Sequence, residues 1–166
     1  MMGGIGVEVY NDLKIYDFST KEWKHQEYNN VDVIYIPDPR FGHKIAKWNN
    51  QLVCFAGNGE IIPKMKSRKS FADLRLFNLA TNEWVGQDFS RDGKQENKKR
   101  VNHAAAIMGG MLVIHGGYNS DENYMYNQIE ICDLTYKKWL VGQLKVHVTK
   151  SKKQVEEVEL PNPKDI

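Results

Sequence analysis

Three copies of one short pattern recur along this chain and constrain its fold more than any other feature. Each copy has a doublet of small residues, a polar stretch, an aspartate or asparagine, and a tryptophan six residues later. In chain order, the copies are Gly3-Gly4, Asp17 and Trp23; Ala56-Gly57, Asn78 and Trp84; and Gly116-Gly117, Asp133 and Trp139. The tryptophans lie 61 and 55 residues apart. A repeat of this size indicates a supersecondary unit that is used several times.

Short runs of alternating apolar and polar residues predict β-strands rather than helices. In the first complete unit, strands are expected at residues 43–48, 51–56 and 73–78, with a fourth at Trp84. The run 51–56 is mostly apolar, as in a strand buried on both faces, and residues 58–72 are expected to form a long polar loop. The second unit repeats this order, and the glycine follows the histidine by 14 positions in both units, as Gly57 follows His43 and Gly117 follows His103.

The repeated residues resemble kelch repeats. The resemblance rests on the glycine doublet, the Asp-x5-Trp spacing and the lead-in Arg40-Phe41-Gly42-His43, which returns as Arg100-Val101-Asn102-His103. It covers about residues 3–142, with Ala56, Asn78 and Asn102 departing from the pattern. The resemblance implies an all-β fold, a segment of a kelch-type β-propeller made of four-stranded antiparallel blades.

The register of the repeats divides the chain into four parts. Residues 1–39 are expected to hold a partial blade, with the end of a second strand, the third and fourth strands, and a linker. Residues 40–99 and 100–144 each form one blade, and residues 145–166 form a charged insertion or tail that leads towards a further blade. Two blades and two fragments cannot close a ring of about 4–8 blades. The remaining blades are therefore expected from sequence beyond this chain or from another chain.

The repeated residues are expected to have structural roles. The glycines lie where backbones pack closely, and the aspartate or asparagine holds a turn through its own side chain. The tryptophans are expected to be buried between adjacent blades. His43 and His103 occupy equivalent positions, which predicts one repeated structural hydrogen bond.

No catalytic arrangement is visible in the sequence. It has no Gly-x-Ser-x-Gly, phosphate loop or His-Glu-x-x-His, and the histidine spacing requires no metal site. We therefore expect no enzyme activity, no metal and no cofactor. Cys54 and Cys132 lie in strand-like runs, which favours buried free thiols in a reducing compartment. No segment has the pattern of a membrane span or signal peptide, and the net charge of +2 is too small to indicate nucleic acid. We expect a cytoplasmic location, with a cytoskeletal or ciliary association as a further alternative.

The loops between the repeats offer a candidate binding surface. Residues 58–72 have a charge balance of +3 and residues 86–100 of +2, whereas residues 118–126 are rich in tyrosine and carry −2. These loops are expected on one rim, where basic residues and tyrosines could bind a partner protein with an acidic segment. The alternative is a set of solvated surface loops. The candidate binding residues are Lys64, Lys66, Arg68, Lys69, Lys98, Lys99, Arg100, Tyr118, Tyr124 and Tyr126.

Two functions follow from this pattern. The first is a non-enzymatic scaffold for protein–protein interaction, a common role of proteins with this resemblance. The alternative is a regulatory kelch domain of a larger enzyme, such as a kelch-containing phosphatase. Propeller oxidases with copper, Tyr, Cys and His form a third class, but no separable set of such residues is present here.

Overall fold

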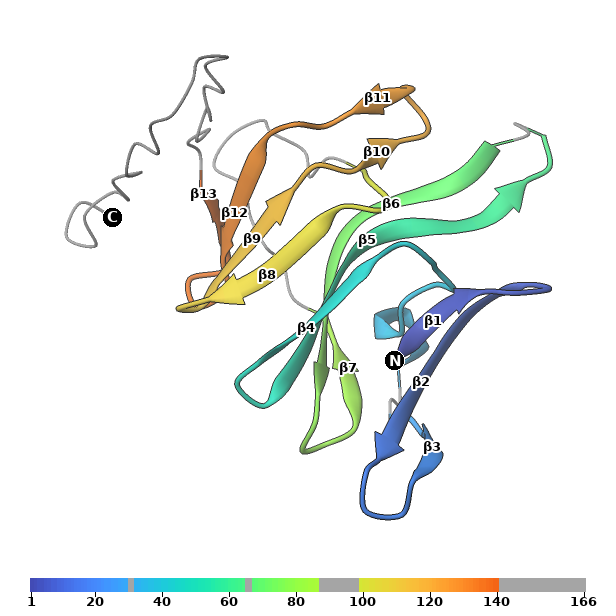
Figure 1. Cartoon of the computed structure of the whole chain (residues 1–166), viewed down its shortest axis with the longest axis vertical. Helices are drawn as coiled ribbons and strands as arrows, with labels where there is room; N and C mark the ends of the chain where they lie inside the picture. The colour runs from blue at the N-terminus through green and yellow to red at the C-terminus, as the bar shows by residue number, and fades with distance from the viewer. Residues whose placement is uncertain (30–31, 65–66, 87–98, 141–166) are drawn as a thin grey trace, which may run out of the picture.

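The protein is built from three antiparallel sheets that follow one another along the chain and stand side by side (Figure 1). The computed structural model describes residues 1–29, 32–64, 67–86 and 99–140. The first sheet has three strands, and the second and third have four each. A two-stranded hairpin and a short 3-10 helix, η1 (Val33–Tyr35), are the other elements of the described residues. The predicted all-β fold with four-stranded antiparallel sheets is thus confirmed.

Each sheet is an antiparallel meander, and the third sheet carries an inserted hairpin between its second and third strands. The first sheet contains β1 (Met2–Ile5), β2 (Val9–Asp17) and β3 (Glu22–Gln26). The second sheet contains β4 (Lys44–Trp48), β5 (Gln51–Ile62), β6 (Ser67–Asn78) and β7 (Glu83–Val85). The third sheet contains β8 (Ala104–Met108), β9 (Met111–His115), β12 (Ile129–Asp133) and β13 (Lys138–Leu140). Between β9 and β12 the chain forms the hairpin of β10 (Tyr118–Asn119) and β11 (Tyr124–Met125).

The hydrophobic core lies in the two seams between neighbouring sheets. The second sheet contributes to both seams because successive residues of β5 point to opposite faces. Val53 and Phe55 pack against the third sheet, whereas Cys54 packs against the first. This arrangement confirms that the apolar run in β5 belongs to a strand buried on both faces.

The predicted polar loop at residues 58–72 is instead mostly paired strand. β5 continues past Gly57 to Ile62, and β6 begins at Ser67, so that the two strands form a long hairpin. Pairs such as Ile61 with Arg68 continue the β-ladder into this segment, with register shifts on both sides of residue 58. The expected strand end at residue 56 is instead a β-bulge between Phe55 and Gly57, after which Gly57 pairs with Phe71 and the ladder continues.

The aspartate or asparagine of each repeat holds the turn after the third strand of its unit. The side-chain oxygens of Asp17, Asn78 and Asp133 each accept hydrogen bonds from the backbone N–H groups two and three residues later, at 2.8–3.4 Å. The residue four positions later has φ between 55° and 60° in all three copies. The expected turn is therefore present, because this side chain replaces the missing backbone acceptor.

Replacing Asp133 by alanine is expected to lower the free energy of unfolding by about 1–2 kcal/mol, because two part-buried hydrogen bonds from the backbone N–H groups of Thr135 and Tyr136 are lost. Urea unfolding followed by tryptophan fluorescence measures this change. The matched control is Asp133→Asn, which keeps the acceptor oxygen that Asn78 supplies in the second sheet. Equal losses in the two variants would contradict the proposed role of the oxygen.

The second glycine of the doublet and the histidine of the lead-in are linked by close packing. A Cβ added at Gly57 would lie 2.9 Å from the Cβ of His43, and one added at Gly117 would lie 2.9 Å from the Cβ of His103. Because real Cβ atoms do not approach so closely, glycine is required there. The residue before it also has positive φ, and even Ala56 adopts φ of 59°. This contact explains the shared spacing of 14 residues in the two units.

One repeated tryptophan departs from the expectation. Trp84 and Trp139 are 1% and 0% exposed, but Trp23 is 57% exposed. Trp84 and Trp139 pack in the seam formed with the sheet that precedes their own. Within the described residues no sheet precedes the first one, so the expected burial of Trp23 is wrong for this structure.

Candidate functional site

Two hairpins from different sheets meet at one end of the molecule (Figure 1). The β5–β6 hairpin and the β10–β11 hairpin are joined by a polar contact between the hydroxyls of Ser70 and Ser120, 2.8 Å apart. The Ser70 hydroxyl also donates to Asp121 at 3.1 Å, and the amide of Asn58 donates to Ser120 at 3.4 Å. These contacts place the two predicted loop regions on one surface, which we call the rim surface.

The basic residues of the rim surface are largely engaged with their own neighbours. Lys69 is paired with Asp38 at 2.7 Å, and Lys99 with Asp121 at 2.9 Å. The guanidinium of Arg68 donates to the backbone of Gly59 and lies 5.0 Å from the ring centroid of Phe41. Lys64 is exposed at the tip of the β5–β6 hairpin, whereas Lys66 and Lys98 lie outside the described residues.

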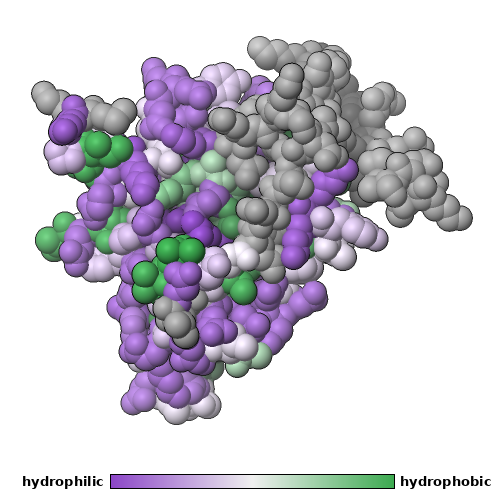
Figure 2. Space-filling view, turned by 180° about the vertical axis from the view of Figure 1, so that it is seen from behind, coloured by the Kyte–Doolittle hydropathy of each residue, from purple (hydrophilic) through white to green (hydrophobic). Residues whose placement is uncertain are grey.

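The surface seen from behind is mostly hydrophilic (Figure 2). Hydrophilic residues dominate the view in Figure 2, and apolar residues form small separate patches among them. On the rim surface itself, Tyr124 is 45%, Met125 70% and Ile61 54% exposed. Tyr118 is half-buried, and its hydroxyl donates to the side-chain oxygen of Asn123 at 2.9 Å. The rim surface therefore offers aromatic and apolar side chains as well as charge.

Two of the predicted binding residues are buried, which corrects their assignment. Arg100 is 0% and Tyr126 is 7% exposed, so neither presents its side chain to a partner. Arg100 donates to the carbonyl of Gly116 at 3.1 Å and is paired with Glu130 at 2.9 Å. Its guanidinium lies over the ring of Tyr126, 4.3 Å from the centroid.

Arg40 makes the equivalent arrangement in the second sheet. It is also 0% exposed, donates to the carbonyl of Ala56 at 3.1 Å and lies 4.2 Å from the ring centroid of Phe71. Its acidic partner is Asp73, to which its two terminal guanidinium nitrogens donate at 2.7 and 3.1 Å. The register that aligns Arg100 with Arg40 was visible in the sequence, and it marks both arginines as repeated structural anchors.

The two lead-in histidines are held in an environment that disfavours their charge. Burial, followed by the positive charge of Arg40, lowers the pKa of His43 to about 4. Burial, followed by Arg100, likewise lowers the pKa of His103 to about 4. His103 packs edge-on against Phe55 instead of making the predicted hydrogen bond, while His43 has one with the backbone of Met2. The repeated feature is thus a buried neutral ring rather than one repeated hydrogen bond.

The protein is expected to lose stability as the pH falls from about 6.5 to about 4. Both histidines have folded-state pKa values below the ordinary histidine pKa of 6.5, so the unfolded chain binds more protons in this range. At about 1.4 kcal/mol per pKa unit, each contributes up to about 3 kcal/mol. Urea unfolding at several pH values measures the slope.

The variant His103→Phe keeps the ring packing and is expected to flatten this slope. His25→Gln is the matched control, because His25 is exposed in β3 and makes no buried contact. An unchanged slope in His103→Phe would show that other groups cause the acid destabilisation.

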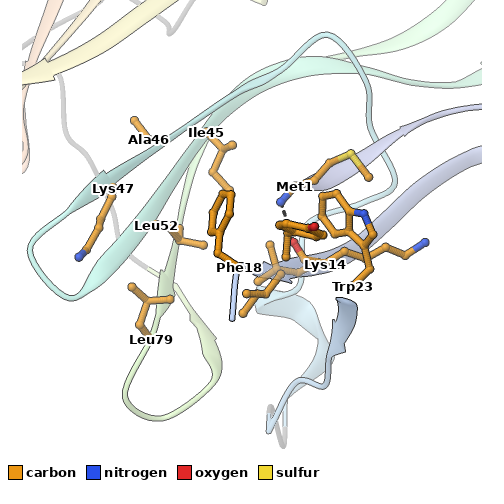
Figure 3. Close-up of a pocket in the computed structure, with 12 residues that line it drawn as sticks. Met1, Lys14, Phe18, Trp23, Ile45, Ala46, Lys47, Leu52 and Leu79 are labelled. Carbon is orange, nitrogen blue, oxygen red and sulfur yellow. Dashed lines mark hydrogen bonds between the residues drawn. The ribbon is translucent and has the colours of Figure 1, made fainter. Parts of the chain in front are cut away.

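A cleft of about 440 Å³ opens between the first and second sheets (Figure 3). Its lining is mostly apolar, and Phe18 points into it towards Ile45 and Leu52, while Lys14 and Lys47 also line it. The first sheet has no counterpart of β4, since its three strands match the last three of the second sheet. The repeat register predicts that this strand is missing from the first unit.

The described residues contain no cluster of metal ligands, and their two cysteine thiols are buried. No group of three or more His, Cys, Asp or Glu side chains gathers there as metal ligands do. Cys54 and Cys132 are buried and free, and burial raises the pKa of the Cys54 thiol to about 12. Such a thiol is not a nucleophile at neutral pH.

In the part of the chain that the structure describes, no helix is both long and apolar enough to cross a membrane.

Successive four-stranded meanders that bury their cores in the seams between sheets define a propeller-type repeat protein. The profile of the KLHDC2/KLHL20/DRC7 Kelch-repeats domain matches residues 1–156, and the chain belongs to the kelch-repeat family. Kelch-repeat domains are generally non-catalytic modules that bind other proteins.

Several curated proteins are similar to this chain. The protein ral2 of Schizosaccharomyces pombe is 24% identical over 163 residues, which cover 86% of this chain and 26% of ral2. The protein tag-53 of Caenorhabditis elegans is 21% identical, with 83% of this chain and 10% of tag-53 covered. A probable serine/threonine-protein kinase of Dictyostelium discoideum is 29% identical over 106 residues, covering 63% of this chain and 7% of the kinase. The chain thus spans about a quarter or less of the length of these relatives.

Proposed function

We propose that this chain is a non-enzymatic interaction module that binds a partner protein through the rim surface. The observation that supports the proposal is the junction of two hairpins from different sheets through Ser70, Ser120 and Asp121. Such a junction fixes the exposed Tyr124 and Met125 relative to the β5–β6 hairpin. Aromatic side chains on a fixed frame are typical anchors of protein interfaces, because they bury a large area at a small cost in conformational entropy.

The ion pairs within the rim surface reduce the positive charge that is available to a partner protein. Lys69 and Lys99 already have acidic partners, so the balance of free charge is smaller than the loop sequences suggest. We propose that tyrosine and apolar contacts contribute most of the affinity, and that charge contributes mainly to orientation. A preference for an acidic segment stays a prediction, supported by the exposed Lys64 and the half-buried Arg68.

The double variant Tyr124→Ala with Met125→Ala is expected to weaken partner binding by at least about tenfold, because anchor residues are typically worth more than 1–2 kcal/mol. The measurement is affinity capture with the tagged chain from its own cell extract, quantified by mass spectrometry. A second variant that reverses the charges of Lys64, Lys66, Arg68 and Lys69 tests the preference for an acidic partner.

The matched control is Tyr136→Ala, because Tyr136 is 80% exposed in the turn between β12 and β13, at the opposite end of the third sheet. Partners of the rim surface are lost in the double variant and kept in this control. If the same proteins are captured by all variants, the rim surface is not the binding site. If only the charge-reversal variant keeps its partners, recognition does not depend on an acidic segment.

A second candidate is a regulatory kelch domain attached to a larger enzyme. The observation in its favour is the similarity to part of the Dictyostelium discoideum kinase. The full-length transcript tests this alternative, because an enzyme domain in the same reading frame would establish it. A phosphatase in that position is the other form of this proposal.

We also propose a cytoplasmic location, with cytoskeletal or ciliary association as alternatives. The two buried free cysteines support a reducing compartment. Imaging of a fluorescently tagged chain tests this proposal, and secretion of the chain would contradict it.

A further inference from the structure

Tyr124 differs from the other tyrosines of the rim surface in the surroundings of its hydroxyl. It is 45% exposed and begins β11 at the tip of the β10–β11 hairpin (Figure 1). The hydroxyl of Tyr118 donates to Asn123, and that of Tyr126 accepts from the buried amide of Asn119. No described residue forms a hydrogen bond with the hydroxyl of Tyr124, whose ring packs edge-on against that of Tyr126 at 5.0 Å. The Tyr124 hydroxyl is therefore free to react.

The residues before Tyr124 form an exposed acidic turn. All of residues 121–125 are exposed, and the side-chain oxygen of Asn119 holds the turn by accepting from the backbone of Asp121 and Glu122 at 3.0 and 3.4 Å. The two acids thus lie three and two positions before the tyrosine. Asp121 belongs to the junction with the β5–β6 hairpin, whereas Glu122 forms no ion pair with a described residue. Glu122 therefore presents its charge to solvent beside the tyrosine.

The strand that Tyr124 begins also has an open edge. Within the described residues, β11 pairs only with β10. The backbone N–H and C=O groups of Tyr118 are both bonded to Val101, so they are not available to Met125, which lies opposite Tyr118 in the register. The backbone groups of Met125 therefore point away from β10. An extended segment with such an edge can be bound by another protein through strand addition.

Tyr136 has the opposite charge environment at similar accessibility. It is 80% exposed in the turn after β12, but Lys137 and Lys138 follow it directly. Asp133, three positions before it, is 3% exposed and uses its carboxylate to hold the turn. Exposure therefore does not separate the two tyrosines, whereas the free acidic charge before Tyr124 does.

We propose that Tyr124 is a phosphorylation site for a protein tyrosine kinase that selects acidic residues before its target. Kinases distinguish their substrates by charge patterns of this kind. In the reaction, the hydroxyl oxygen of Tyr124 forms a bond to the γ-phosphorus of ATP, and the bond from that phosphorus to the leaving ADP breaks. The phenolic proton passes to a carboxylate of the kinase.

Phosphorylation of Tyr124 regulates the rim surface, an inference that rests on the proposed function. The phosphate adds a charge of about −1.5 to −2 to a side chain that otherwise serves as an aromatic anchor. Asp121 and Glu122 already lie beside it, so the hairpin tip becomes strongly acidic. Burying this dianion in an interface is costly, and an acidic partner is repelled. The phosphorylated chain is thus the form that releases its partner.

Treatment of the full chain with a purified tyrosine kinase of this class, Mg²⁺ and ATP tests the site. Peptide mass spectrometry is expected to show Tyr124 modified at least about tenfold faster than Tyr136. Glu122→Gln is expected to slow the modification of Tyr124 several-fold, whereas Glu22→Gln, which changes an exposed acid in β3, leaves the rate unchanged. Equal rates at the two tyrosines, or a Tyr124 rate that Glu122→Gln does not change, would overturn the site.

Affinity capture with the kinase-treated and untreated chain tests the regulation. The partners that are lost in the double variant of Tyr124 and Met125 are expected to bind the phosphorylated chain at least about tenfold more weakly. The matched control is kinase-treated Tyr124→Phe, which keeps the ring without a hydroxyl and is expected to retain these partners. Equal capture by the treated and untreated chain would overturn the regulation. If the double variant loses no partner, the proposed function and its regulation both fail, whereas the phosphorylation rates still decide the modification site.

Discussion

Arg100→Ala is expected to lower the free energy of unfolding by about 3–5 kcal/mol, the usual cost of removing one partner of a buried ion pair. Arg100 is 0% exposed, and the side chain of its partner Glu130 is only 11% exposed. Without the guanidinium, the ion pair with Glu130 is lost and the carbonyl of Gly116 loses a donor. Urea unfolding at neutral pH, followed by circular dichroism, measures the difference.

The matched control for Arg100→Ala is Arg68→Ala. Arg68 is half-buried on the rim surface, where it donates a hydrogen bond to the carbonyl of Gly59 and lies over the ring of Phe41, so we expect a loss below about 1 kcal/mol. The paired substitution Arg100→Met with Glu130→Leu removes both charges and is expected to recover much of the loss. Equal effects of Arg100→Ala and Arg68→Ala would contradict the anchoring role.

Trp139→Ala is expected to destabilise the protein by about 3–5 kcal/mol, as large aromatic deletions in a core do. Trp139 is 0% exposed and packs against Phe55 across the seam, with ring centroids 5.4 Å apart. The deletion leaves a cavity between two sheets that the rigid strands cannot close. Thermal and urea unfolding both measure this loss.

Trp23→Ala is the matched control for Trp139→Ala because both residues occupy the same repeat position. In dilute protein we expect a loss below about 1 kcal/mol, since Trp23 is 57% exposed. Trp84→Ala, at 1% exposure, should resemble Trp139→Ala. If all three variants lose equal stability, the tryptophans act within their own sheets and not across the seams.

The repeat spacing predicted the parts of the fold that depend on local chemistry. The side-chain acceptors at Asp17, Asn78 and Asp133 were predictable because an Asx turn needs only residues close in sequence. The mostly apolar run around Val53 was enough to predict a strand buried on both faces. Whether Trp23 is buried or exposed could not be predicted in this way, because its exposure depends on a neighbouring sheet that the pattern does not specify.

The binding residues show where reasoning from loop charge is insufficient. Arg100 was counted with the basic loop, although its register with Arg40 places it below the surface. Tyr126 has the same register as Phe71, and both are buried beneath an arginine. Adding up the charges of a loop assumes that every charged side chain in it is solvated. Lys69 and Lys99 are instead paired with acidic residues that are distant in sequence, which a loop-by-loop sum does not take into account.

The two cysteines give each seam its own chemical reporter. Cys54 lies between the first and second sheets, and Cys132 lies between the second and third. A thiol reagent reaches either side chain only when the adjacent sheets separate, so the two labelling rates under native conditions report the opening free energies of the two seams separately. The natural sequence therefore allows the order in which the sheets come apart to be read without any engineered probe.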